Sequence, residues 1–134
     1  MRFGKQSLKN LTLLSYNLQW VMREALAMEL MDFSVICTHR SRGDQNQAYI
    51  DGKSKVRWPN SKHNSMPSKA VDCVPYVNGK ISWNAMHCCC LAFMILTVAK
   101  KIGVKIRWGG NWDMDSEPIT DQDFNDLVHF EEVA

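Results

Sequence analysis

The sequence predicts a single α+β domain, built from a small antiparallel sheet with flanking helices. Two observations lead to this fold class. Short runs typical of strands stand between longer segments in which apolar residues recur at helical spacing. The chain of 134 residues is long enough to bury one core, and no repeat, linker or low-complexity tract divides it. We therefore expect residues 1–134 to form one domain.

The first part of the chain is expected to hold helices and then a strand. Apolar residues recur at helical spacing within residues 8–30. Asn17 is a possible N-cap inside this segment, which favours a short first helix and a longer second one that ends near Met31. Phe33–Cys37 alternates as a strand does, and residues 38–41 leave it as a loop. Loops at strand ends commonly hold functional residues.

The rest of the chain is divided by turn signals, including Gly52, an Asn78–Gly79 turn and Gly103 as a helix C-cap. The expected segments are, in order, a helix over Gln45–Asp51, a polar loop over residues 53–68, a strand over Ala70–Tyr76, a helix from Ser82 or Asn84 to about Lys101, a strand over Val104–Trp108, an acidic loop over residues 111–122 and a strand over residues 124–133.

Composition narrows the class of protein. Hydrophobic content of 46% and charged content of 22% are those of an ordinary soluble globular domain. A formal net charge of +2 is too small to indicate a nucleic-acid partner, so none is expected. Positive charge does gather between residues 53 and 69, where it can attract an anionic substrate or polymer. A solvated basic loop explains that cluster equally well.

Cysteine usage and the apolar segments indicate a reducing compartment. The five cysteines are an odd number, and no apolar segment of a signal peptide follows the N-terminus. Cys88, Cys89 and Cys90 would diverge by about 100° each on a helix, so they are expected to pack rather than to bind one metal. The apolar run over residues 85–99 falls short of the roughly 20 residues of a spanning helix, so no stable membrane insertion is expected.

Two polar residues stand out in the central part of the chain. His63 follows a polar turn, and Asp72 lies inside the apolar strand Ala70–Tyr76. A carboxylate buried there costs several kcal/mol unless a cation, a hydrogen-bond network or a metal compensates it. Zinc accepts both residue types, and a catalytic zinc site takes three protein ligands and leaves one position open. The segment Asp126–Glu131 is the best place for a third ligand.

These residues belong to a longer pattern that resembles a known family. The pattern is Ser61-x-His63-Asn64-x-x-Pro67-Ser68-x-Ala70-Val71-Asp72-x-x-Pro75-Tyr76, followed near the end by Asp126-x-x-His129-Phe130. It resembles phage endolysins of the L-alanyl-D-glutamate endopeptidase type, a zinc metallopeptidase family related to the D-Ala-D-Ala carboxypeptidases and dipeptidases. Further matches extend the resemblance over nearly the whole chain: Phe3 and Ser7, Asp32–Val35, His39-Arg40-Ser41 with Gln45, Gly52–Lys55 and Arg107–Gly110.

The resemblance implies a D-Ala-D-Ala metallopeptidase-like, or Hedgehog-like, fold with a zinc site at the sheet face. It implies that His63, Asp72 and His129 hold Zn²⁺, a donor set that suits this ion. Asp126 matches the family's general base, which takes a proton from the attacking water.

The resemblance also assigns residues to the substrate cleft. Arg40 matches an arginine that binds a carboxylate or stabilises a developing oxyanion, although a surface arginine is the simpler interpretation. His39 can contribute a donor beside it. Ser61 and Gln45 match positions near the metal, where they can orient its ligands.

The spacing of the proposed base raises a geometric difficulty. On a regular strand, positions three apart point to opposite faces, so Asp126 and His129 converge only if Asp126 lies in a turn or bulge. Glu131, two positions after His129, would share its face and is the rival base. The family pattern favours Asp126.

The chain departs from the family pattern at two places. Asn111 stands where the family often has an aspartate, and Thr38 replaces a common glycine before the His-Arg pair. Asn111, Asp113 and Asp115 loosely resemble the start of a calcium loop, but the glycine and the distal glutamate of an EF-hand are missing. A second ion in this loop is therefore not expected.

The function that the resemblance implies is a zinc-dependent peptidoglycan endopeptidase, a bacteriolytic endolysin that cleaves the stem peptide between L-Ala and D-Glu. Such a protein would be a monomer, would accumulate in the cytoplasm of the host bacterium and would reach the wall through a holin-type pore. Two alternatives stay open, namely a D,D- or L,D-carboxypeptidase and a non-catalytic zinc-stabilised wall-binding domain. Release of a single D-alanine would identify the first alternative.

Overall fold

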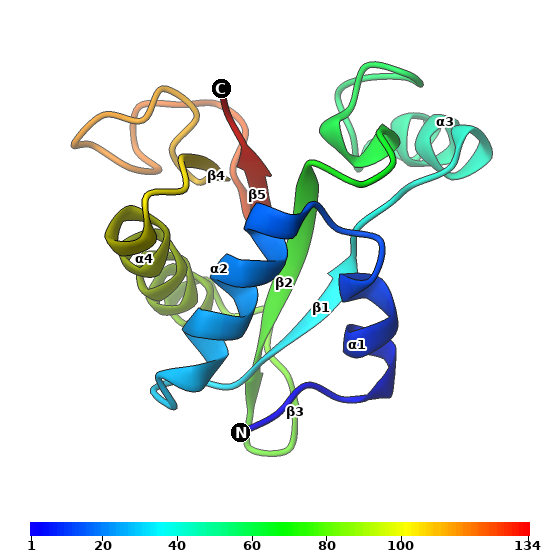
Figure 1. The fold of residues 1–134 in the computed structure, drawn as a ribbon. Coiled ribbons are helices and arrows are strands. Elements are labelled where there is room, and N and C mark those ends of the chain that lie inside the picture. The colour runs from blue at the N-terminus through cyan, green and yellow to red at the C-terminus, as the bar shows by residue number, and fades with distance from the viewer.

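The computed structural model describes residues 1–134 and contains four α-helices, one short 3₁₀ helix and five strands (Figure 1). In chain order these are α1 (Lys5–Leu11), α2 (Tyr16–Ala27), β1 (Phe33–Cys37), α3 (Arg42–Ile50), η1 (Lys62–Asn64), β2 (Ala70–Val77), β3 (Lys80–Ile81), α4 (Ala85–Ile102), β4 (Ile106–Gly109) and β5 (Asp126–Glu132). The strands form one antiparallel sheet in the order β1-β2-β5-β4, with β3 paired to the end of β2. The predicted fold class is confirmed.

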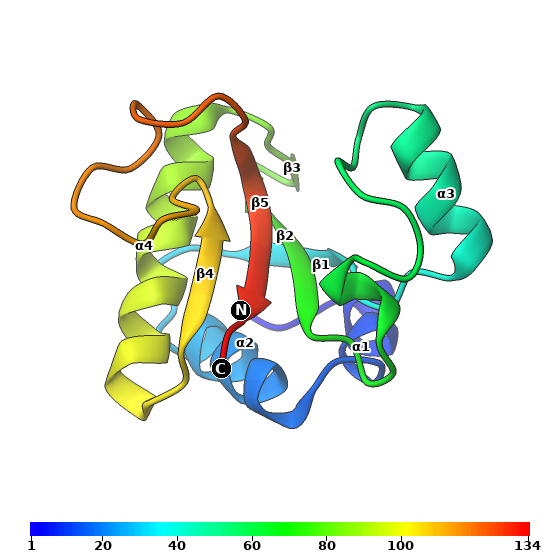
Figure 2. The same ribbon diagram turned by 90° about the horizontal axis from the view of Figure 1, so that it is seen from above.

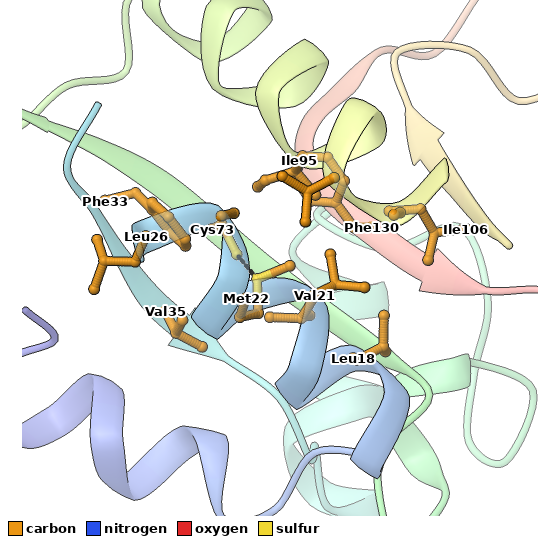
Figure 3. Close-up of a cluster of buried hydrophobic side chains, with 14 of the residues drawn as sticks. Leu18, Val21, Met22, Leu26, Phe33, Val35, Cys73, Ile95, Ile106 and Phe130 are labelled. Carbon is orange, nitrogen blue, oxygen red and sulfur yellow. Dashed lines mark hydrogen bonds between the residues drawn. The ribbon is translucent and has the colours of Figure 1, made fainter. Parts of the chain in front are cut away.

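Helices α2 and α4 enclose the hydrophobic core against the sheet, whereas α3 lies apart from them on the other side of β2 (Figures 1 and 2). The core contains 22 buried residues, and Figure 3 shows the side chains of α2 facing those of the strands and of α4. Helix α4 is long and apolar enough to cross a membrane by length and composition alone. Seven of its residues are buried inside the protein, as in a core helix.

Strand alternation decides which side chains face away from this core. In β2, Val71 and Cys73 are buried in the core, so Asp72 between them points to the opposite face. The same alternation in β5 places Phe130 in the core and turns His129 and Glu131 away from it. Polar side chains from neighbouring strands therefore gather on the face of the sheet that α2 and α4 leave open.

Two helix boundaries differ from the prediction. Asn17 is not the N-cap of α2, because Ser15 occupies that position and its hydroxyl accepts a hydrogen bond from Leu18 N at 3.4 Å. The helix ends at Ala27 rather than near Met31, and Glu29 adopts a φ of 55°, which a right-handed helix cannot contain.

The other differences also follow from local hydrogen bonds. Helix α3 begins three residues before the predicted Gln45, because Ser41 accepts a hydrogen bond from Asp44 N at 3.2 Å and caps the helix. The predicted polar loop over residues 53–68 contains η1, and strand β3 was not predicted. Helix α4 begins after Asn84 and ends at Gly103, whose φ of 84° confirms the predicted C-cap.

Candidate metal site and catalytic cleft

Three ligand atoms form an equilateral triangle on the open face of the sheet. His63 Nε2, Asp72 Oδ1 and His129 Nδ1 are each 3.3 Å from the other two. A tetrahedral zinc ion with nitrogen and oxygen ligands at 2.0–2.1 Å requires its ligand atoms to be about 3.3–3.4 Å apart. The three side chains therefore fit a zinc ion as they stand, with the fourth position left to the cleft.

Strand pairing positions Asp72 and His129, and a capped 3₁₀ helix positions His63. Asp72 on β2 and His129 on β5 are direct antiparallel partners, so both reach the same point of the same face. His63 comes from η1, where Ser61 accepts a hydrogen bond from His63 N at 3.2 Å as part of a capping box. Residues far apart in the sequence thus meet at one point of the sheet.

The outer nitrogen of each histidine is held by an acceptor. His63 Nδ1 donates to the carbonyl of Thr38 at 2.7 Å, and His129 Nε2 donates to Glu131 Oε1 at 2.8 Å. These bonds fix the tautomers, so His63 Nε2 and His129 Nδ1 present lone pairs to the centre of the triangle. Arg107 in turn holds Glu131 at 2.8 Å.

Cys37 forms a second candidate grouping with His63 and Asp72. Its Sγ lies 3.9 Å from His63 Nδ1, the nitrogen already bonded to the Thr38 carbonyl. Because one nitrogen cannot serve both partners, the set that uses His63 Nε2 together with His129 is the better metal site. Both sets share His63 and Asp72.

In the metal-free protein, the cluster raises the pKa of His63 and lowers the pKa of Asp72. Burial alone would lower the pKa of His63, but the hydrogen bond to Asp72 and the negative charge of that carboxylate, with Cys37 nearby, outweigh burial and raise the pKa to about 10. Burial would raise the pKa of Asp72, yet hydrogen bonds from His129 and His63 bring it well below its usual value. Asp72 is thus ionised and His63 protonated near neutral pH in the metal-free protein.

Asp126 reaches the same cleft through a bulge. Trp108 pairs with Phe130, but the next residue of β4, Gly109, pairs with Asp126, so three residues of β5 have no counterpart on β4. This irregularity lies between Asp126 and His129, where the spacing argument required a turn or bulge. Burial raises the pKa of Asp126, and the nearby charge of Asp72 raises it further.

Glu131, the rival base, has its carboxylate occupied. It accepts hydrogen bonds from His129 Nε2 and from Arg107 Nη2, each at 2.8 Å, and Lys62 Nζ lies 3.7 Å away. Burial would raise the pKa of Glu131, but the hydrogen bonds and positive charges of His129 and Arg107 outweigh burial and lower the pKa to about 2. A carboxylate so strongly ion-paired is a poor proton acceptor at neutral pH.

Of the four residues predicted for the substrate cleft, only some line it. Arg40 lines the cleft, where its guanidinium lies 3.7 Å from Asp72 Oδ2 and donates to Gln45 Oε1 at 3.0 Å. Gln45 is fully buried behind Arg40 and also accepts from Asn64. Ser61 lines the cleft, whereas His39 does not; its ring bonds to the carbonyl of Ser65 at 3.1 Å.

The cleft has a volume of about 1040 Å³ and an aromatic wall that the sequence did not predict in detail. The ring of Trp112 lies 5.6 Å from that of His129 and stacks on Phe124 at 6.3 Å. Lys55 reaches across from the loop after α3, with its Nζ 4.9 Å above the Phe124 ring. Loops that are remote in sequence therefore meet at the cleft.

An open three-ligand metal site, a half-buried carboxylate beside it and a wide cleft define a candidate metallohydrolase. The profile of the phage L-alanyl-D-glutamate peptidase family matches residues 1–133, and the chain belongs to this family. The chain is therefore a peptidase, as the sequence predicted.

Individual relatives agree with this assignment. The L-alanyl-D-glutamate peptidase of Escherichia phage T5 is 33% identical over 121 residues, which is 87% of this chain and 85% of the relative. The crystal structure of the L-Ala D-Glu endopeptidase ChiX of Serratia marcescens matches with a TM-score of 0.80 and 28% identity, covering 99% of this chain and 90% of that one.

Proposed function

We propose that this chain is a zinc-dependent endolysin that hydrolyses the amide bond between L-Ala and D-Glu in the peptidoglycan stem peptide. The observation that supports zinc most directly is the triangle of ligand atoms from His63, Asp72 and His129, whose sides match the edge of a tetrahedral zinc site. The family and its relatives support the bond that is cleaved. A bound zinc ion supplies Lewis acidity, which polarises a carbonyl group and acidifies water.

Asp126 is the proposed general base. Its raised pKa brings it closer to neutral pH than an ordinary aspartate, which suits a group that must accept and return a proton. It takes one proton from the water that attacks the L-Ala carbonyl carbon. When the carbon–nitrogen bond breaks, the same proton passes to the leaving amino group of D-Glu, so the hydrolysis balances.

Arg40 and Glu131 are proposed to support this chemistry in different ways. Arg40 presents its guanidinium to the cleft from a buried anchor, Gln45, and can stabilise an oxyanion or bind a substrate carboxylate. Glu131 holds the His129 ring in the orientation that points Nδ1 to the metal. Glu131 is thus a positioning residue, and Asp126 the catalytic one.

The biological role follows from the family. We propose that the protein acts as a monomer, accumulates in the cytoplasm of the infected bacterium and reaches the peptidoglycan when a holin-type pore opens. The cations Lys53, Lys55 and Lys62 line the cleft and can hold the enzyme on an anionic wall polymer.

Digestion of purified peptidoglycan tests the function. Incubation with the zinc-loaded protein should release stem peptides with new D-Glu amino termini, identified by mass spectrometry after amine labelling. Release of free D-alanine instead would favour a carboxypeptidase. Intact stems in the presence of zinc, with binding to the wall retained, would favour a non-catalytic wall-binding domain.

Zinc affinity is expected to depend on pH over an unusually wide range. A protonated histidine cannot bind metal, and the pKa of His63 in the metal-free protein is about 10. The fraction of protein able to bind therefore rises by about tenfold per pH unit from roughly pH 6 to pH 9, instead of levelling above an ordinary histidine pKa of about 6.5. Competition with a chelator of known affinity measures this slope. A zinc affinity that does not change above pH 7 would mean that the pKa of His63 is not raised in the metal-free protein.

Gly109 is expected to be required for the placement of Asp126. A Cβ built on Gly109 would overlap the Asp126 carbonyl and lie 2.9 Å from Asp126 Cβ. Because a displacement of about 1 Å can cost about 10²-fold in rate, Gly109→Ala should lower kcat/KM by roughly that factor with zinc retained. Gly43→Ala is the matched control, since its added Cβ meets nothing within 4 Å. Equal activity of the two variants would show that the bulge does not position the base.

A further inference from the structure

A second cavity lies along the outer edge of the sheet, away from the catalytic cleft. It has a volume of about 480 Å³, and Arg107 is the single residue that it shares with the cleft. One wall comes from the end of α4, including Leu96 and Lys100, and another from the loop that holds Asn111 and Met114. The floor is the free edge of β4, the last strand in the sheet order (Figure 2). Apart from Arg107, which holds Glu131, the proposed hydrolysis uses none of these features.

The lining shows that this cavity follows a strand edge rather than one face of the sheet. Five consecutive residues, Val104 to Trp108, line it, although successive side chains of a strand point to opposite faces. Lys105 O accepts a hydrogen bond from Val133 N, so the antiparallel alternation directs the N–H and C=O of Ile106 and the N–H of Trp108 to the outer edge. No loop or side-chain hydrogen bond reaches these three groups.

Two side-chain atoms of the same lining are buried without a partner. Arg107 Nε is a donor and Asn111 Oδ1 an acceptor, and neither forms a hydrogen bond. The amide of Asn111 is oriented by its Nδ2, which donates to Asp115 O at 2.8 Å. Because both atoms have almost no exposed surface, an occupant of the cavity does not reach them in this conformation.

The charge of the cavity indicates which peptide fits. Lys100 and Lys105 contribute two positive charges, Arg107 is already ion-paired with Glu131, and no acidic residue lines the cavity. The remaining lining is mostly apolar, with Leu96, Ile106 and Met114 among it. An extended segment that alternates acidic and apolar side chains would pair with the cations and bury its apolar side chains between α4 and the loop.

A second copy of this chain is a poorer occupant. Antiparallel pairing of two β4 strands would bring Lys105 and Arg107 of one copy close to the same cations of the other. Like charges on opposed strands are destabilising. The edge is therefore protected against self-association and open to an acidic strand.

We propose that the free edge of β4 binds an extended acidic-apolar peptide segment of a partner protein by strand addition. Strand β4 has four residues and a rise of about 3.3 Å per residue, so it pairs with three or four residues of the partner. Main-chain hydrogen bonds to Ile106 and Trp108 give the register, and Lys100 and Lys105 select for acidic side chains.

A short synthetic peptide tests this proposal without reference to hydrolysis. The probe is N-acetyl-Glu-Val-Glu-Val-Glu-amide, titrated into isotope-labelled, zinc-loaded protein at low salt. The backbone amide signals of Ile106 and Trp108 should shift and become protected from hydrogen exchange, while those of Asp72 and His129 stay unchanged. The same peptide N-methylated at its central glutamate should lose the protection at Ile106. Unchanged Ile106 and Trp108 signals at millimolar peptide, or equal binding of the Lys-Val-Lys-Val-Lys analogue, would overturn the proposal.

A matched pair of variants on α4 distinguishes peptide binding in the cavity from general charge effects. Lys100→Glu and Lys101→Glu change the net charge equally, but only Lys100 lines the cavity. Lys100→Glu should weaken binding of the acidic probe by about three- to tenfold, and Lys101→Glu should weaken it by less than about twofold. Equal losses would mean that the peptide binds by charge alone, which would also overturn the proposal. Neither residue lies in the catalytic cleft, so digestion of peptidoglycan should be unaffected.

Discussion

Asp126→Asn is expected to reduce hydrolysis of peptidoglycan by about 10²- to 10⁴-fold, the usual contribution of a general base. The side-chain volume hardly changes, but the amide cannot accept and return the proton. Zinc content should stay at the wild-type value, because Asp126 is not part of the ligand triangle. Initial rates of amine release, metal analysis and a thermal melt on the same samples measure the three quantities.

The thermal melt distinguishes a catalytic role of Asp126 from a structural one. Burial raises the pKa of this carboxyl, so its ionised form opposes folding at any pH above the ordinary aspartate range. Asparagine carries no charge there, and the variant, melted without zinc, should therefore have an unchanged or higher Tm near pH 7. A lower Tm together with lower activity would indicate that Asp126 supports the fold instead.

Two further carboxylates serve as controls for Asp126. Asp123→Asn makes the same change at an exposed position three residues earlier and should keep full activity. Glu131→Gln replaces a carboxylate that accepts from both His129 and Arg107 with an amide that has one acceptor oxygen, and it should weaken zinc binding by about 10- to 100-fold. If Glu131→Gln kept its zinc affinity and lost activity as severely as Asp126→Asn, the assignment of the base would have to be reversed.

Much of this fold could be predicted because its signals are local. The run at Phe33–Cys37 is strand β1 as predicted, the run at Ala70–Tyr76 is strand β2 with one further residue at its end, and Gly103 ends α4 as expected. The predictions failed where two local signals competed. Ser15 and Asn17 are both good caps, and only the packing of α2 decides between them.

The site could be predicted only in part, since its geometry depends on contacts between distant segments. Asp72 was conspicuous because an apolar strand surrounds it, and the family pattern supplied His129. The carbonyl of Thr38 that fixes the His63 ring has no side-chain signature at all. The bulge before His129 was inferred as a requirement, but its length depends on the pairing of β5 with β4, which no local pattern encodes.

Of the three proposed zinc ligands, His63 is the one whose substitution should distinguish metal binding from folding most clearly. His63→Ala is expected to abolish hydrolysis and tight zinc binding, because two remaining ligands do not make a catalytic zinc site. In the wild type, zinc at about 1,000 times its Kd stabilises the fold by about 4 kcal/mol, which raises Tm on the order of 10–20 °C in a domain of this size. His63→Ala should show almost none of this zinc-dependent rise. Melting curves with and without zinc measure it, alongside metal content.

His87→Ala is the matched control for His63→Ala. His87 lies near the start of α4, where its Nδ1 bonds to the hydroxyl of Ser82 at 2.6 Å, far from the ligand triangle. Its substitution should leave the zinc-dependent rise in Tm and the rate of hydrolysis unchanged. The zinc-dependent rise is the difference between two melts of the same variant. A general loss of stability caused by removing the buried His63 side chain therefore does not affect it. A full rise in His63→Ala would mean that zinc binds elsewhere, and the triangle of His63, Asp72 and His129 would no longer explain the activity.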